Sequence, residues 1–341
     1  MLFYKNLFHT SIGINYTINN KDNWDFYLGS MNKSNVSVFT PWYITGITDG
    51  EGSFQITIQD KKGKGKTGFK PFLEFKITQK EHSKGILHEI KKYFKCGRIN
   101  IDNRKTNTMK FVVTNNSDLL NKVIPHFEKF PLKTSKYLNF MDFKYATLLM
   151  NNKEHFEKQG IEKLIKIKSN MNKLRPFKEK FDYCWNQNIL NLEPEWIEGF
   201  IDSEGTFQCE INSVDNKNSK ENSNVSSKIN FSLQIKQNNH DVAILYAIKN
   251  FFGSGYLKPK YDIKNSEATE NAVRSATALW IRNSEIICQF IDLYPLYTIK
   301  RLDYLDWKRL IILKKEKAHL TKKGLTLMRN IKNNMNSNRV K

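Results

Sequence analysis

A short acidic segment occurs twice in this chain: DGEGSFQ starts at Asp49, and DSEGTFQ starts at Asp202. Each copy places a glutamate, Glu51 or Glu204, directly before a glycine. If the helices that end at these glutamates pack side by side, two carboxylates meet two helix C-termini, which carry partial negative charge. A divalent cation would relieve that repulsion, and hard oxygen ligands suit Mg²⁺. The repeated segment therefore predicts a Mg²⁺ site that Mn²⁺ or Ca²⁺ can also occupy. The alternative is that both glutamates are solvated turn residues and the glycines only end the helices.

Small residues in both copies favour close packing of these two helices. Gly46 and Gly50 are four residues apart, as are Gly199 and Ser203. Small side chains at this spacing share one helix face and let two backbones approach closely. Each helix is expected to begin at a proline, which a first helical turn tolerates.

The repetition extends over most of the chain. ITQKEHSKGILHEIKKYFKCG aligns with IKQNNHDVAILYAIKNFFGSG, and FPLKTSK aligns with YPLYTIK. The distance between paired segments changes only in polar stretches, as expected where loops differ in length. The chain is therefore expected to be a fused pseudo-dimer with five parts: an N-terminal extension (1–40), a first repeat (41–172), a linker (173–193), a second repeat (194–336) and a C-terminal tail (337–341).

Each repeat has the pattern of an α+β unit. In SFQITIQ, apolar and polar residues alternate with the period of a half-buried strand, and residues 229–236 of the second copy alternate in the same way. A helix over residues 86–94, closed by Gly97, comes next, before two more strands and further helices. The sheet of each repeat should have one apolar and one polar face.

Other polar residues recur at matching positions of the two copies. Gln79 pairs with Gln237, and Lys136 pairs with Lys300. Beside an acidic site these residues could position water and stabilise the charge of a phosphate. Three further pairs are expected to be structural: Asp49 with Asp202, His82 with His240, and His155 with His319.

The composition narrows the class of partner. The 55 Lys and Arg residues exceed the 34 Asp and Glu residues, so the formal net charge is +21. Such an excess favours a polyanion, either nucleic acid or an anionic membrane surface. No apolar run approaches the roughly 20 residues that span a bilayer, and the four cysteines are too scattered for a zinc ribbon or a disulfide framework. Abundant Lys, Asn, Ile, Phe and Tyr can be encoded by A/T-rich triplets, as in an organelle genome, and the N-terminus resembles no transit peptide.

ITGITDGEG (44–52) and IEGFIDSEG (197–205) resemble the two motifs of a single-chain LAGLIDADG homing endonuclease of the organellar, intron-encoded type. The similarity continues in HFEKFPLKTSK, NNKEHFEKQGIEKLIKIKSNMN and KKEKAHLTKKGL, and so covers most of the chain. The resemblance implies a saddle of two antiparallel sheets, each from an αββαββα repeat, that straddles duplex DNA.

The resemblance also implies roles for single residues. Its metal-binding acids map to Glu51 and Glu204, with backbone carbonyls of Gly50 and Ser203 in the metal shell. The implied catalytic set is Glu51, Glu204, Gln79, Gln237, Lys136 and Lys300. The polar sheet faces are expected to contact DNA through Ser53, Gln55, Thr57, Gln59, Lys70, Glu74, Lys76, Thr78, Arg98, Asn100, Asp102 and Arg104 in the first repeat. The corresponding set in the second repeat is Thr206, Gln208, Glu210, Asn212, Lys228, Asn230, Ser232, Gln234, Lys236, Tyr256, Lys258 and Lys260.

Two features depart from the family pattern. Thr48 replaces an apolar residue of the first motif, which could loosen the helix interface. Ser83 and Asp241 stand where some relatives carry a basic residue after the glutamine, which could lower activity.

The sequence thus predicts a monomeric mitochondrial DNA endonuclease that makes a staggered double-strand break in a long, non-palindromic site and promotes intron homing. The main alternative is an RNA maturase that assists splicing of its host intron, with intron RNA as partner. A catalytically inactive DNA-binding regulator is a third possibility. The presence of both glutamates favours the nuclease.

Overall fold

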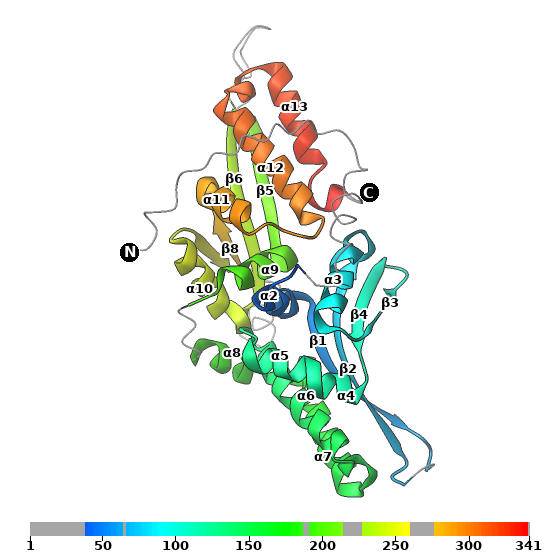
Figure 1. Cartoon of the computed structure of the whole chain (residues 1–341). Helices are drawn as coiled ribbons and strands as arrows, with labels where there is room; N and C mark the ends of the chain where they lie inside the picture. Colours follow the sequence, from blue (N-terminus) through cyan, green and yellow to red (C-terminus); the bar gives the residue numbers. More distant parts are fainter. Residues whose placement is uncertain (1–37, 64–65, 187–190, 214–226, 260–275, 340–341) are drawn as a thin grey trace. The chain divides into compact units, whose positions relative to one another are not determined.

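The computed structural model describes residues 38–63, 66–186, 191–213, 227–259 and 276–339, and Ser37–Lys341 belong to one compact unit (Figure 1). The main elements of the first repeat are α2 (Pro41–Glu51), β1 (Gly52–Asp60), β2 (Phe69–Lys80), α3 (Lys84–Phe94), β3 (Arg98–Asn103), β4 (Thr108–Val113), α4 (Asn116–Asp118), α5 (Ile124–Lys129), α6 (Lys136–Asn151) and α7 (Lys158–Ser169). A short 3₁₀ turn, η1 (Glu81–Ser83), separates β2 from α3.

The second repeat has the same order of elements. It consists of α9 (Pro194–Glu204), β5 (Gly205–Ser213), β6 (Ser227–Asn238), η5 (Asn239–Asp241), α10 (Val242–Phe252), β7 (Tyr256–Pro259), β8 (Ala276–Ile281), α11 (Ser284–Leu293), α12 (Lys300–Lys315) and α13 (Lys322–Asn333). The α+β class and the αββαββα order are confirmed in both repeats, with additional helices after each.

The two sheets have equivalent topology and register. Both are antiparallel, with strand orders β1-β2-β4-β3 and β5-β6-β8-β7. Gly52 lies opposite Ile77 in the first sheet, and Gly205 lies opposite Ile235 in the second. Because the glycines follow α2 and α9 directly, each sheet starts where its motif helix ends.

Strand alternation gives each repeat a core of its own. Phe54 and Phe75 stack in the first core with ring centroids 5.1 Å apart, and Phe207 packs against Trp307 at 5.4 Å in the second. Helices α6 and α7 contact β1, and α12 contacts β5. Burial of these aromatic rings is the main driving force for closing helices over one face of each sheet.

Helices α2 and α9 join the two repeats by direct packing (Figure 1). A Cβ added to Gly46 would lie 2.1 Å from the carbonyl oxygen of Trp196, and one added to Gly199 would lie 2.4 Å from that of Tyr43. Backbone therefore meets backbone, as the spacing of small residues predicts. Both helices begin with proline in the first turn, which is also as predicted.

Thr48 is fully buried in the first motif helix. Its hydroxyl donates to the carbonyl oxygen of Ile44 at 2.7 Å, one turn earlier in the same helix. Because this hydrogen bond satisfies the hydroxyl, the polar side chain leaves no unpaired donor at the helix interface.

Alanine substitutions can test the helix contact. Gly46→Ala should lower the free energy of unfolding by about 1–3 kcal/mol, because its methyl group would meet backbone that cannot rotate away. Gly50→Ala should also destabilise, since its Cβ would lie 2.0 Å from the Oγ of Ser203. Adding Ser203→Gly removes that side chain, so it should restore stability to Gly50→Ala but not to Gly46→Ala. Urea unfolding of the four variants measures this, and equal rescue of both would contradict the packing.

Two local features differ from the prediction. Helix α3 ends at Phe94, and Lys95 forms its left-handed cap with φ 51°, so closure at Gly97 was wrong. Gly97, at φ +77°, instead lies just before β3, where a Cβ would come within 2.6 Å of the Phe111 ring. The predicted linker also contains a helix, α8 (Phe177–Asn186), that the sequence patterns did not indicate.

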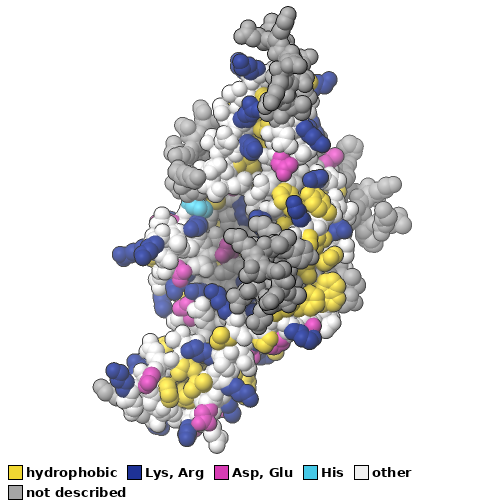
Figure 2. Space-filling model, turned by 180° about the vertical axis from the view of Figure 1, so that it is seen from behind, with side chains coloured by type: hydrophobic (Ala, Val, Ile, Leu, Met, Phe, Trp, Pro, Cys, Tyr) yellow, Lys and Arg dark blue, Asp and Glu magenta, His cyan; other side chains and the backbone are white. Residues whose placement is uncertain are grey.

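The surface of the described residues carries many cations. Lys and Arg side chains recur over the face shown in Figure 2, with fewer acidic side chains between them. Among the helices that the structure describes, none combines the length and the apolar character needed to cross a lipid bilayer.

Candidate active site

The two motif glutamates meet at the paired helix ends. Glu51 is the last residue of α2, Glu204 is the last residue of α9, and both are half-buried. A Cβ added to Gly50 would lie only 3.5 Å from the Cγ of Glu204. Burial raises the pKa of both carboxyl groups, and the charge of Glu204 raises that of Glu51 further, while Lys300 and Lys136 oppose these effects. The two acids therefore repel each other in a partly desolvated place, as the repeated segment predicts.

A lysine lies against the end of each motif helix. Lys136 begins α6, and its Nζ donates to three carbonyl oxygens of α2: Thr48 at 2.8 Å, Asp49 at 2.9 Å and Gly50 at 3.2 Å. Lys300 begins α12, and its Nζ donates to two carbonyl oxygens of α9: Ile201 at 3.2 Å and Ser203 at 2.8 Å. Burial lowers the pKa of both ammonium groups, and the neighbouring carboxylates act in the opposite direction. Each ammonium offsets the negative end of a helix dipole.

Asp49 and Asp202 brace the segments that carry these lysines. Asp49 accepts hydrogen bonds from the backbone N–H groups of Lys133, at 2.9 Å, and Thr134, at 3.2 Å. It also accepts from the Trp196 indole at 2.8 Å, across the helix pair. Asp202 repeats the arrangement, accepting from the Tyr297 and Thr298 N–H groups and from the Tyr43 hydroxyl. This agrees with the structural role predicted for both aspartates.

The paired glutamines lie beside the glutamates. Gln79 and Gln237 follow Ile77 and Ile235 on the helix-covered faces of β2 and β6, at the level where the motif helices end. Gln79 is nearly buried, and the Gln237 amide hydrogen-bonds to Glu204, which lowers the pKa of that carboxyl. The structure thus brings all six predicted catalytic side chains to one region.

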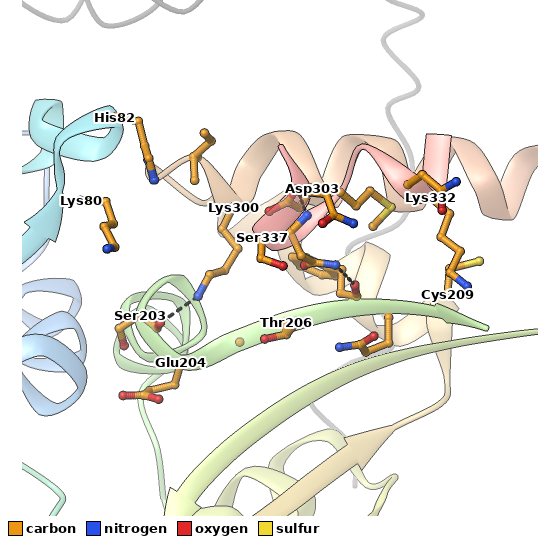
Figure 3. A pocket seen from close by; sticks show the side chains of 18 of the residues that line it. Lys80, His82, Ser203, Glu204, Thr206, Cys209, Lys300, Asp303, Lys332 and Ser337 are labelled. Carbon is orange, nitrogen blue, oxygen red and sulfur yellow. Dashed lines mark hydrogen bonds between the residues drawn. The ribbon is translucent and has the colours of Figure 1, made fainter. Parts of the chain in front are cut away.

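Two hollows meet at Glu204, which lines both of them, and each hollow is lined by both repeats. The first contains Glu204, Lys300 and Lys332 from the second repeat, with Lys80 and His82 from the first. Figure 3 shows Lys300 directed at the helix end of Ser203 and Glu204, with Lys80 and His82 across from it. The second hollow is lined by Gly50, Lys136, Lys168, Lys173 and Lys180, together with Glu204, Gln237 and Asp241.

Five lysines of these hollows were not among the predicted site residues: Lys80, Lys168, Lys173, Lys180 and Lys332. Lys80 follows Gln79 directly, and its charge lowers the pKa of Glu51. Its position beside a symmetric glutamine was a signal that could have identified it. Lys180 comes from linker helix α8, and no sequence pattern marked it, because its place depends on how the linker folds. Ser83 and Asp241, the positions noted as lacking a basic residue, are both buried.

The predicted DNA-contacting residues of the first sheet line its polar face. All members on β1, β2 and β3, and Arg104 in the turn before β4, are half-buried or exposed. Near the middle of this face, Lys76 and Lys110 each lie 3.5 Å from Asp102, and Lys110 lies 3.5 Å from Glu74. Lys110 was not predicted, because β4 shows little polar alternation.

The second sheet differs from the prediction at two positions. Ser232 and Gln234 lie on the polar side of β6 but are only 6% exposed. Both occupy the centre of the strand, where neighbouring strands shield them: Gln208 lies opposite Ser232, and Gln234 lies between Thr206 and Trp280. The other predicted residues in the described part of this sheet are half-buried or exposed, and Lys260 lies outside the described residues.

Comparison with known proteins identifies the lineage of this fold and site. The sequence profile of LAGLIDADG endonucleases matches residues 44–147 and 197–311, which include most of both motif helices and both motif glutamates. The chain belongs to the LAGLIDADG endonuclease family. A curated relative, probable intron-encoded endonuclease 3 of Neurospora crassa, is 29% identical over 84% of this chain and 52% of its own length. The chain thus spans about half the length of that relative.

Solved structures of LAGLIDADG proteins share the architecture. The I-LtrWI LAGLIDADG homing endonuclease bound to target DNA is 29% identical, with a TM-score of 0.74, and the match covers 87% of this chain and 98% of that one. I-SmaMI bound to an uncleaved DNA target in the presence of calcium ions is 25% identical, with a TM-score of 0.72, over 87% of this chain and 99% of that one. The saddle of two sheets implied by the resemblance is therefore the fold of this family member.

Proposed function

We propose that this chain is a site-specific DNA endonuclease that makes a staggered double-strand break and thereby promotes homing of the intron that encodes it. The observation that supports this most directly is the convergence of Glu51 and Glu204, one from each repeat, next to two lysine-lined hollows that meet at Glu204. Glu204 lines both hollows, and Glu51 ends the helix packed against that of Glu204. A pair of acids next to two corresponding hollows suits a substrate with two equivalent scissile bonds. Duplex DNA is such a substrate.

A divalent cation fits the donor set at the helix ends. No group of three or more His, Cys, Asp and Glu side chains in the part of the chain that the structure describes is arranged so that it could hold a metal ion. The available ligands are instead the carboxylates of Glu51 and Glu204 and the carbonyl oxygens of Gly50 and Ser203, and such hard oxygen atoms suit Mg²⁺, Mn²⁺ or Ca²⁺. A bound cation would stabilise negative charge that develops on the phosphate during hydrolysis.

The remaining side chains would act on the phosphate and on water. The Lys136 and Lys300 ammonium groups are fixed by helix carbonyls, so they would add positive charge without reorganising during the reaction. Gln237 is held by Glu204, and with Gln79 it would orient the attacking water or the carboxylates. Each hollow would serve one DNA strand.

The two polar sheet faces are chemically different. The first carries the cluster of Glu74, Lys76, Asp102 and Lys110, whereas the second carries Trp280 beside neutral side chains at its centre. Laid in the major groove, where all four base pairs can be distinguished, unlike faces would read unlike half-sites. The target would therefore be long and non-palindromic. The intron-encoded relative and the A/T-codable composition support a mitochondrial origin.

Cleavage of a plasmid that carries the intronless junction of the host gene tests the proposal. In Mg²⁺ the protein should convert this plasmid to a linear form with staggered ends, and it should leave a plasmid with the intron-containing allele uncut. The intron splits the recognition sequence of the second plasmid, which makes it the matched control. Absence of cutting in Mg²⁺ and Mn²⁺ by folded protein that binds the host intron RNA would instead favour the maturase.

A further inference from the structure

In each repeat, one side chain accepts a hydrogen bond from the backbone of the other repeat, at the residue just before Lys136 or Lys300. Asp241 of the second repeat, at the end of η5, is buried and accepts a hydrogen bond from the backbone N–H of Ser135 at 2.8 Å. Ser135 is the N-cap of α6, and Lys136 is the first residue of that helix. The start of α6 is therefore fixed by the second repeat as well as by its own.

The reciprocal contact is present but weaker. The Ser83 hydroxyl, at the end of η1, accepts a hydrogen bond from the backbone N–H of Ile299 at 3.2 Å. Ile299 is the N-cap of α12 and directly precedes Lys300. Ser83 is neutral and Asp241 is acidic, and hydrogen bonds to a charged acceptor are roughly twice as strong as neutral ones. The two lysine segments are thus held unequally.

Asp241 is held in place by further contacts. Its Oδ1 also accepts from the Cys184 thiol of linker helix α8 at 2.9 Å, and its Oδ2 lies 3.2 Å from the Nε2 of His240. Burial raises the pKa of Asp241, but His240, Cys184 and the Ser135 N–H together lower it below the usual value. The carboxylate therefore stays ionised although it is enclosed. Linker, second repeat and first repeat all meet at this one side chain.

We propose that Asp241, from the second repeat, is a positioning residue for Lys136 in the first. The lysine that serves one DNA strand is then held by a charged hydrogen-bond acceptor, Asp241, whereas the lysine that serves the other strand is held by a neutral one, Ser83. This rests on the proposed nuclease function. Lys136 contacts the carbonyl oxygens beside Glu51, so a shift at the start of α6 would move its ammonium relative to the phosphate. Small displacements of this kind can slow a reaction by about 100-fold.

Strand-resolved nicking tests the proposal. The probe is a duplex of the intronless host junction with a different label on each strand, cut in Mg²⁺ under single-turnover conditions. Lys136→Met and Lys300→Met first establish which strand each hollow serves. Asp241→Ala should then slow the Lys136 strand by about 10- to 100-fold and leave the other strand within about threefold. Asp241→Asn keeps an oxygen that can accept from Ser135, so it should recover most of the lost rate.

Ser83→Ala is the matched variant in the other repeat. It should slow only the Lys300 strand, and only by about two- to fivefold, because a neutral hydrogen bond is lost. Melting temperature and DNA affinity in Ca²⁺ show whether a variant is folded and still binds DNA, so that slower cleavage can be assigned to a displaced lysine and not to misfolding. If Asp241→Ala does not fold, Ser83→Ala decides, since it must slow the Lys300 strand alone, and any smaller slowing by Asp241→Asn must be confined to the Lys136 strand.

Equal slowing of both strands by any of these variants, or slowing of the strand opposite to the one assigned, would overturn the proposal. A failure of the unaltered protein to cut either strand is a different result. It would overturn the proposed nuclease function, and this inference with it, and the unaltered protein in every assay shows which of the two has failed.

Discussion

Replacing Glu51 or Glu204 with glutamine is expected to abolish double-strand cleavage while leaving DNA affinity unchanged or slightly higher. The two carboxylates are the anionic side chains at the last positions of the motif helices, and Glu204 lines both hollows. Glutamine keeps the shape and removes the charge that holds the cation. Without metal the acids repel phosphate, so their neutral replacements should bind DNA at least as well. The loss should affect both strands, because Glu204 lines both hollows and Glu51 is electrostatically coupled to it.

The same substitutions should make the metal-free protein more stable. Burial and the neighbouring carboxylate raise the pKa of Glu51, so the folded state binds its proton more tightly than the unfolded state does. Stability contributed by such a group is present at low pH and is lost as pH rises through the folded pKa. Glutamine cannot ionise, so Glu51→Gln should melt above the unaltered protein at neutral pH, and the difference should vanish in acid.

Glu162→Gln is the matched control, because this glutamate lies exposed on α7, away from both hollows. It should cut at the rate of the unaltered protein and melt at the same temperature. Strand-specific rates in Mg²⁺, affinity in Ca²⁺ and melting curves against pH measure all three properties. Cleavage at full rate by either motif variant would refute the metal-site assignment, whatever its melting behaviour.

The sequence predicted well those features that depend on local pattern or on internal symmetry. Gly46 and Gly199 identified the helix contact because their spacing has one simple geometric meaning. The convergence of Glu51 and Glu204 was predictable because the repeat placed one acid at the end of each motif helix. Strand alternation likewise placed Gln55 and Gln208 on the polar faces, where both are half-buried.

Features that depend on distant contacts were missed. Asp241 looked like a departure from the family pattern, yet it is a buried acceptor for a residue of the other repeat. Lys180 looked like a linker charge, yet α8 brings it into a hollow. Ser232 and Gln234 follow the polar alternation, but their neighbours across the sheet bury them. Alternation fixes the face on which a side chain lies and does not fix its exposure.

DNA affinity is expected to fall steeply with salt. The described hollows are lined by lysines from both repeats and from the linker helix: Lys80, Lys136, Lys168, Lys173, Lys180, Lys300 and Lys332. Each lysine that contacts a phosphate releases condensed counterions from the duplex. A protein with about 6–10 such contacts loses roughly 10³- to 10⁵-fold in affinity between 50 and 200 mM salt. Titrations in Ca²⁺ at several salt concentrations measure the slope, and a constant Kd over this range would refute polyanion binding through these cations.

Two lysines of helix α8, Lys180 and Lys178, allow the effect of the second hollow on salt dependence to be separated from the effect of net charge. Lys180 lines the second hollow, whereas Lys178, on the same helix, has a side chain that is 85% exposed and pairs with Asp182 at 2.6 Å. Lys180→Gln should reduce the slope of log Kd against log salt by about one, because one phosphate contact is lost. Lys178→Gln removes the same formal charge from the same helix but should leave the slope unchanged. If both variants change the slope equally, the salt dependence of binding reflects the net charge of the protein alone, and the DNA backbone does not pass through this hollow. A change confined to Lys180 would place the linker helix in the DNA interface, where no sequence pattern had put it.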